Sequence, residues 1–217
     1  MLNQQQAFAV GEETLKMARI AGLDYADATN LMTSALRGFN MEINETSAKR
    51  INDVYSELAA ITAADTNEIA TAMTKVASIA DSANMSFENT SAFLSQIIET
   101  TREAPTTAGT ALKTIIARFS EVKELVSEGA LTGVDGEGEA IEINKIDTAL
   151  EQVGISLKDY ISGKTGLDEI FLQLAQKWDN LSLATQRYIA TTAAGSRRTK
   201  AAHYLLRRYN IDNQKSS

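Results

Sequence analysis

The sequence predicts an all-α fold, a multi-helix bundle or helical array of about eight to ten helices, in two lobes joined by an acidic, glycine-rich loop. Apolar residues recur along most of the 217 residues at the i, i+3, i+4, i+7 spacing that places them on one face of a helix. The chain has one proline, the strongest helix breaker, so long stretches can remain helical. Short polar residues and glycines stand where these helices should begin and end.

Each apolar stripe marks one expected helix. In the front part of the chain the stripes span residues 31–39, 51–61, 69–80, 87–98 and 112–126. After a break they resume over residues 167–178 and 189–209. Because each stripe covers one side only, these helices are expected to cover a shared apolar core.

Local chemistry marks the ends of the helices. Asp65 can accept a hydrogen bond from a free N–H group at a helix start, and Glu68 can reach back to the N–H of Asp65, as in a capping box. Pro105 precedes a helical run, where its missing N–H costs nothing. The same reasoning places helix starts at Asp24, Ser86 and Ser182, and helix ends with left-handed glycine caps at Gly22, Gly38 and Gly154.

A weak internal similarity links residues 21–27 with residues 83–89. Both stretches combine a helix end, a small turn, an apolar residue, a cap, an aromatic residue and an acidic first turn. Two unrelated helix–turn–helix joints can converge on this chemistry, and a duplicated two-helix unit would also produce it.

The helical pattern is interrupted between residues 128 and 143. Gly129, Gly133, Gly136 and Gly138 stand there among acidic residues, and such a segment can bury little surface. We expect an exposed, mobile loop. It divides the chain into a front helical lobe (residues 1–128), a flexible acidic loop (129–143) and a back helical lobe (144–217).

The composition excludes several classes of function. The chain has no cysteine and one histidine, which removes disulfides, thiol nucleophiles and zinc or iron–sulfur sites built on thiolates. With 21 basic and 28 acidic residues the net charge is −7, which argues against non-specific binding to nucleic acid. No apolar run reaches the length of a membrane-spanning helix. The first ten residues carry no basic residue, so no signal peptide is expected.

The acidic loop imitates two ligand sites. Asp135, Glu137 and Glu139 alternate as at the opening of a calcium loop, but position 12 is Ile146 and position 6 is Ala140. The glycines around Glu137 lack the third glycine and the preceding strand of a phosphate cradle. A solvated acidic loop is the better interpretation, and no metal or cofactor is expected.

His203 is the one residue that titrates near neutral pH without help. It could form a hydrolytic triad with Ser196 and Asp212, but the chain contains no nucleophile elbow. A partly buried histidine on a helix is the favoured interpretation. We therefore expect that the protein is not an enzyme.

The end of the chain is locally basic, with tyrosines interleaved. Such a pattern occurs on surfaces that bind single-stranded nucleic acid, but a solvated helix face or one that docks on an acidic surface is favoured because the rest of the chain is acidic. The candidate partner-binding residues are Arg187, Arg197, Arg198, Lys200, Arg207 and Arg208.

Five blocks of the sequence carry a family likeness. They are Asn84-Met85-Ser86-Phe87-Glu88, the run from Thr107 to Phe119, the run from Ala149 to Asp159, Leu167-Asp168-Glu169-Ile170 with Leu174, Trp178, Leu181 and Gln186, and Ala194-Gly195-Ser196-Arg197-Arg198. In this order they resemble the conserved region of phage tail tape measure proteins. Together they cover roughly residues 23–209. No block is decisive alone, but five in register are specific.

The resemblance implies a non-enzymatic structural protein of a phage or prophage tail. Such proteins lie inside the tail tube, set its length during assembly and leave ahead of the DNA. It further implies tail-tube, tail-tip and tail-assembly chaperone proteins as partners, self-association, and a location in the virion tail or, during assembly, in the host cytoplasm. Members are generally much longer than this chain, so we expect a domain of a longer protein.

A second function remains open, a cytoplasmic helical scaffold or adaptor that binds a protein partner in a groove between helix pairs. The uncharged small residues at 106–111 and 190–195 also suggest a hypothesis of their own. They would let helices pack closely, or change their packing when the protein enters or leaves a tube.

Overall fold

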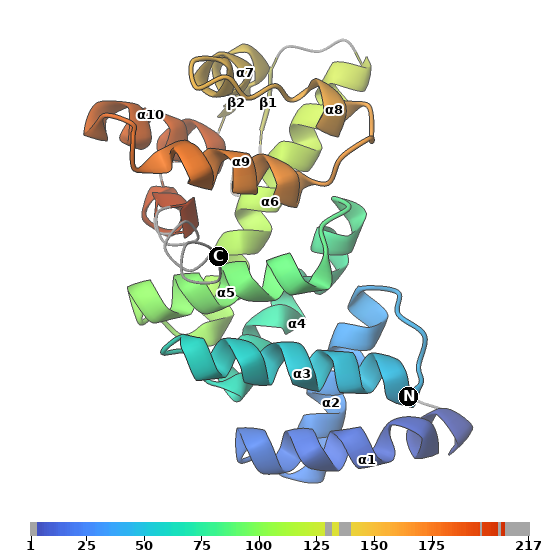
Figure 1. The fold of residues 1–217 in the computed structure, drawn as a ribbon. Helices are drawn as coiled ribbons and strands as arrows, with labels where there is room; N and C mark the ends of the chain where they lie inside the picture. Colours follow the sequence, from blue (N-terminus) through green and yellow to red (C-terminus); the bar gives the residue numbers. More distant parts are fainter. Residues whose placement is uncertain (1–3, 129–131, 135–139, 196, 204, 207–217) are drawn as a thin grey trace. The chain divides into compact units, whose positions relative to one another are not determined.

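The computed structural model describes residues 4–128, 132–134, 140–195, 197–203 and 205–206 (Figure 1). The predicted all-α fold is confirmed, since ten named helices account for most of the described residues and the two short strands form one hairpin. No helix among the described residues is long and apolar enough to cross a membrane.

The chain divides into two compact units. Unit 1 comprises Met1–Asp81 and Phe87–Thr110, and unit 2 comprises Ser82–Ser86 and Ala111–Ser217. The boundary therefore falls inside a helix, and the short turn at 82–86 belongs to unit 2. The division predicted from the sequence, at residues 129–143, is a different one and stays a prediction.

Unit 1 is a set of amphipathic helices that are consecutive in the chain. The helices are α1 (Gln4–Ala21), α2 (Tyr25–Gly38), α3 (Glu45–Ile61), α4 (Thr66–Ser82), α5 (Phe87–Thr101) and the start of α6 (Pro105–Glu128). α1 packs on both α2 and α3, and α3 packs on α5. The ring of Phe87 lies 5.4 Å from Phe39 and 5.4 Å from Tyr55, centroid to centroid, so three elements meet in one aromatic cluster.

The predicted helix caps in unit 1 are present. The Asp24 carboxylate accepts from the N–H of Asp27 at 2.8 Å. Asp65 accepts from the N–H of Glu68 at 2.8 Å, and Glu68 accepts from the N–H of Asp65 at 3.0 Å, which confirms the capping box. A further cap, Asn44 on the N–H of Ser47, was not predicted.

The predicted role of Gly38 is wrong in its detail. α2 does end at Gly38, but the left-handed residue of that turn is Asn40, with φ 47°. Gly38 is needed for another reason, because a Cβ there would overlap with the Cβ of Ala77 on α4. Glycine at this position permits the close approach of two helices and does not form a left-handed cap. Gly22 and Gly154 do have positive φ, as predicted.

Unit 2 contains the rest of α6 and the elements that follow it. They are β1 (Thr132–Val134), β2 (Ala140–Glu142), α7 (Ile143–Glu151), α8 (Lys158–Ile161), α9 (Leu167–Trp178) and α10 (Leu183–Ala194). Phe119 of α6 and Phe171 of α9 pack edge to face at 5.6 Å, and α7 packs on α10. Trp178 is fully buried at the end of α9.

The segment predicted as an unstructured loop contains a β-hairpin. β1 and β2 pair antiparallel, with Thr132 opposite Glu142 and Val134 opposite Ala140. Residues 135–139 lie outside the described residues. Val134 followed by Asp135-Gly136, with the apolar pair Ala140-Ile141 after it, is a sequence signal for a hairpin. Gly133 faces Leu125 of α6 so closely that a Cβ there would require the leucine to move.

Candidate functional site

The predicted partner-binding residues fall at the C-terminal end of unit 2. Arg187 is exposed on α10, and Arg197 and Lys200 are exposed in the turn and short helical segment that follow it. Arg198 is only partly exposed. The remaining two predicted residues, Arg207 and Arg208, lie outside the described residues.

The start of α10 is fixed by two side chains. Ser182, a predicted cap, accepts from the N–H of Thr185 at 3.1 Å. The amide of Gln186 donates to the carbonyl oxygen of Trp178 at 2.7 Å, which ties α10 to the last residue of α9. These bonds orient α10 so that Ile189 and Ala190 are buried while Arg187 points to solvent.

The end of α10 folds the basic turn back on the helix. Gly195 adopts φ 75°, a conformation that L side chains rarely adopt. After this turn the hydroxyl of Thr199 donates to the carbonyl oxygen of Gly195 at 2.9 Å and lies 3.3 Å from the hydroxyl of Thr191. Residues 197–200 thus lie beside the last exposed turn of α10.

His203 lies in the helical segment after this turn, and its ring packs edge-on against Trp178 with 5.5 Å between centroids. This contact agrees with the interpretation of His203 as a packed helical histidine. Ser196 and Asp212, the other members of the alternative triad, lie outside the described residues. The same holds for Asp135, Glu137 and Glu139 of the calcium-loop comparison.

A second polar site in unit 2 was not predicted, and it joins the turn at 82–86 to the start of α9. The N–H of Leu167 donates to the carbonyl oxygen of Ala83 at 3.1 Å. The carboxylate of Asp168, 9% exposed, accepts from the N–H of Ser86 at 3.0 Å and from that of Glu169 at 3.1 Å. We call this arrangement the 83–168 clasp.

The clasp depends on two unusual backbone positions. Asn84 has φ 56°, in the left-handed region where asparagine is tolerated better than most residues. A Cβ at Gly166 would overlap with the carbonyl oxygen of Asn84, so only glycine fits there. The N–H of Ser86, the residue before α5, is thus satisfied from another helix by the Asp168 carboxylate, and the predicted cap at Ser86 stays a prediction.

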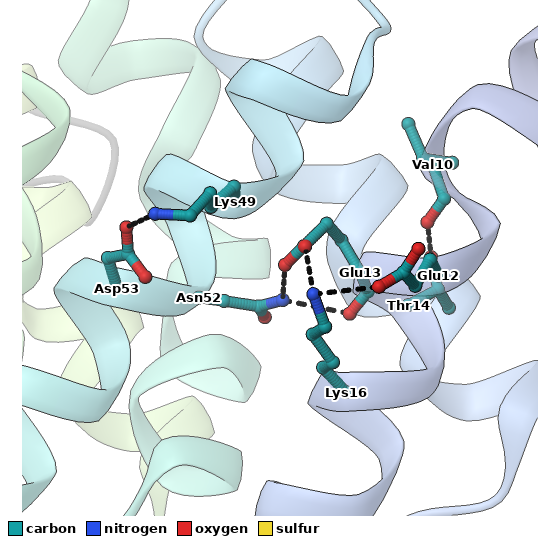
Figure 2. Close-up of polar contacts among 8 residues, drawn as sticks. All are labelled: Val10, Glu12, Glu13, Thr14, Lys16, Lys49, Asn52 and Asp53. Carbon is teal, nitrogen blue, oxygen red and sulfur yellow. Dashed lines mark hydrogen bonds and ion pairs between the residues drawn. The ribbon is translucent and has the colours of Figure 1, made fainter.

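A third polar cluster, in unit 1, lies between α1 and α3 (Figure 2). Glu13 is 3% exposed, and its carboxylate accepts from the ammonium of Lys16 at 2.7 Å and from the amide of Asn52 at 2.9 Å. The same amide donates to the backbone carbonyl of Glu13 at 2.8 Å. Figure 2 also shows the Lys16 ammonium between Glu12 and Glu13.

These bonds decide the charge of Glu13. Burial raises the pKa of Glu13, but the hydrogen bonds from Lys16 and Asn52 lower it by more, so its pKa falls below the ordinary value. The carboxylate is ionised at neutral pH and its partners are already engaged with it. The cluster therefore stabilises the α1–α3 contact and has no feature of a proton-transfer site.

No group of three or more acidic or histidine residues able to hold a metal ion occurs within the part of the chain that the structure describes. What unit 2 does present is a basic surface beside a tightly turned helix end. This arrangement suits contact with another macromolecule.

Comparison with known proteins identifies the class. Residues 2–195 match the model of the family described as phage-related minor tail protein, and the chain belongs to this family. It is thus a structural protein of the phage tail.

A curated relative narrows the class further. The chain is 32% identical over 135 residues to the tape measure protein of Pneumococcus phage Dp-1. This confirms the resemblance to phage tail tape measure proteins. The match covers 60% of this chain but 12% of that relative, so the chain corresponds to a small part of the relative's length. No solved structure matches the chain.

Proposed function

We propose that this chain is a domain of a tape measure protein, which sets the length of the tail, supports its assembly and is released when the DNA is ejected. The observation that carries the proposal is the family match over residues 2–195, together with the tape measure relative. The proposed location is the interior of the virion tail, after synthesis in the host cytoplasm. The proposed partners are tail-tube, tail-tip and tail-assembly chaperone proteins and further copies of the chain.

The helix lengths define what this domain contributes to a ruler. A single helix of 217 residues would span about 330 Å at 1.5 Å per residue. The longest helix in the described residues, α6, has 24 residues and so spans about 36 Å. No described helix is long enough to act as a rod of that length, and we assign this part of the chain to assembly and docking within the longer protein.

The test is an in-frame deletion of the codons for residues 1–217 in the phage or prophage that encodes the chain. Electron microscopy of lysates should show missing tails or tails of altered length. Tails of normal number and unchanged length would contradict the proposal. A shortening of about 330 Å would indicate that these residues form one continuous helix in the tail and would contradict the assignment to a folded domain of shorter helices.

Release is tested separately by mass spectrometry of purified tails before and after DNA ejection is triggered. Peptides from this chain should be present in filled particles and lost from emptied ones. Full retention after ejection would contradict the proposed release while leaving the assembly role standing.

The domain is also proposed to act without catalysis. The purified chain should release no soluble fragments from peptidoglycan, with a known lysozyme as the positive control. Turnover that disappears when one acidic residue is replaced would contradict this part of the proposal.

A further inference from the structure

Charge is strongly segregated along this chain. Residues 180–211 contain no Asp or Glu and six Lys or Arg residues. The other 185 residues hold 15 Lys and Arg against 28 Asp and Glu, a net charge of −13. The basic segment therefore differs in sign from everything around it, and it coincides with α10 and the turn after it.

The exposed face of α10 is both basic and apolar. Ala184, Arg187, Tyr188 and Thr191 follow the i, i+3, i+4, i+7 spacing, and all four are exposed. Leu183, at the edge of this face, is 57% exposed, and Tyr188 is 41% exposed. Tyrosine and arginine are the residue types that contribute most to protein–protein binding energy.

The turn after α10 extends this face. The bonds of Thr199 to Thr191 and to Gly195 hold residues 197–200 against the end of the helix. Arg197 and Lys200 are exposed there. Arg197 and Lys200 are ten or more residues from Arg187 in the sequence. The structure thus places their charges beside the helix that carries Arg187.

We propose that Leu183, Arg187, Tyr188, Arg197 and Lys200 form a docking surface, the α10 surface, for an acidic amphipathic segment of another tail protein. The identification of the partner as a tail protein rests on the proposed function. Charge complementarity selects the partner, because carboxylates match the arginines and lysine while the partner's apolar side chains cover Leu183 and Tyr188.

Nucleic acid fits this surface less well. A phosphate backbone uses the basic residues but leaves Leu183 without a partner. Single-strand binding surfaces combine basic grooves with several stacking aromatic rings, whereas Tyr188 is the one aromatic residue among the described residues of α10. A short acidic protein segment avoids both problems.

The experiment measures binding of the purified 217-residue chain to three fluorescent probes of equal net charge by fluorescence anisotropy. The first is an amphipathic peptide of about 15 residues with leucines on one face and glutamates on the other. The second is poly-L-glutamate, and the third is a thymidine oligonucleotide. The amphipathic peptide should bind about ten-fold more tightly than either of the others. Equal or tighter binding of the oligonucleotide would overturn the proposal, as would absence of binding to the peptide.

Variants divide the surface into its two parts. The double variant Arg187→Glu, Lys200→Glu should weaken peptide binding by ten-fold or more, with roughly additive contributions from the two charges. Its matched control is Lys113→Glu, Lys158→Glu, which makes the same change in net charge at two exposed lysines of unit 2 outside the surface. Equal losses in both variants would reduce the effect to net charge and would overturn the proposal.

The apolar part is tested by the variant Leu183→Ala, Tyr188→Ala. It should weaken binding of the amphipathic peptide by about ten-fold and leave binding of poly-L-glutamate unchanged. No effect on the peptide would overturn the apolar contact. Because these assays use a purified chain and defined probes, they can fail while the chain is still found in tails. The assays can also succeed when the chain is not found in tails. A failure of the docking proposal can therefore be distinguished from a failure of the proposed function.

Discussion

Gly109 is a position where a single added methyl group should destabilise the helix packing of unit 1. It lies in α6, within unit 1, and a Cβ there would overlap with the backbone carbonyl oxygen of Ala72 on α4. The same Cβ would stand 3.0 Å from the carbonyl carbon of Ala72 and 3.0 Å from the Cβ of Lys75. A backbone carbonyl cannot rotate away as the tip of a side chain can. The helices would have to move apart.

The substitution Gly109→Ala brings two opposing terms. Alanine is a better helix former than glycine by about 1 kcal/mol. Overpacking of a close contact costs about 1–3 kcal/mol, and the upper end applies because the obstacle is backbone. We expect a net loss of about 2 kcal/mol in the free energy of unfolding. With a urea m-value of about 2 kcal/mol/M, the unfolding midpoint should fall by about 1 M.

The assay is urea unfolding followed by far-UV circular dichroism, with Gly11→Ala as the matched control. Gly11 is also inside a helix, but a Cβ there would meet only the hydroxyl of Tyr25 at 3.7 Å, an ordinary contact. That variant should gain about 0.5–1 kcal/mol. If Gly109→Ala is as stable as the parent chain, or if both variants lose stability equally, the close approach of α4 and α6 is wrong.

A second glycine contact on α4 distinguishes side-chain from backbone overlap. A Cβ at Gly38 would overlap with the Cβ of Ala77, while the backbone of Ala77 stays 3.4 Å away. The loss caused by Gly38→Ala should therefore be largely restored by adding Ala77→Gly, with a coupling of about 1 kcal/mol or more in a double-mutant cycle. The loss caused by Gly109→Ala should not be restored by Ala72→Gly, because the obstacle there is a carbonyl oxygen.

Three further substitutions test the polar contacts. Asp168→Ala should cost about 1–2 kcal/mol and speed hydrogen exchange of the Ser86 amide, because the clasp loses its acceptor; unchanged exchange would argue against the clasp. Glu13→Gln should cost about 1–2 kcal/mol at pH 7. Since the folded-state pKa of Glu13 is lowered, the parent gains this stability above the unfolded-state pKa and loses it as the pH falls through the folded-state pKa. In urea unfolding at a series of decreasing pH values, the difference between parent and variant should therefore shrink. Asp65→Ala should cost about 1 kcal/mol of thermal stability, whereas Asp81→Ala, at the other end of the same helix, should cost nothing.

Local contacts were the predictable part of this fold. Asp24, Asp65 with Glu68, and Ser182 each act within three residues of their own position, so the sequence contains both partners of each cap. Apolar periodicity located the helices for the same reason, because it depends on spacing within one element. Asn44 caps α3 in the same way and was missed because no apolar stripe begins close to it.

The contacts that were missed join distant residues. The N–H of Ser86 is satisfied by Asp168, which lies 82 positions later in the chain. Gly38 was predicted as a helix end, yet the reason for glycine is Ala77 on another helix. No prediction was made for Glu13, and only the packing of α3 buries it against Asn52. Each case needs the tertiary arrangement, which no local pattern specifies.

The blocks that carry the family resemblance include several of these long-range contacts. In the clasp Asn84 meets Gly166 and Ser86 meets Asp168, and in unit 1 Gly109 meets Ala72. Residues in such positions are constrained by the packing of the chain on itself. Sequence similarity at these residues is therefore stronger evidence for a shared fold and family than for a shared binding partner.

Most residues of the α10 surface do not belong to the blocks that carry the family resemblance. Arg187, Tyr188 and Lys200 lie outside the five blocks, and they are exposed, so their identity is not fixed by internal packing. Two tape measure proteins can thus share the clasp and the close helix contacts while presenting different charges on α10. If the α10 surface binds a tail partner, its specificity will follow these exposed residues. Exchanging them with those of a relative should change partner choice without changing the stability of the domain.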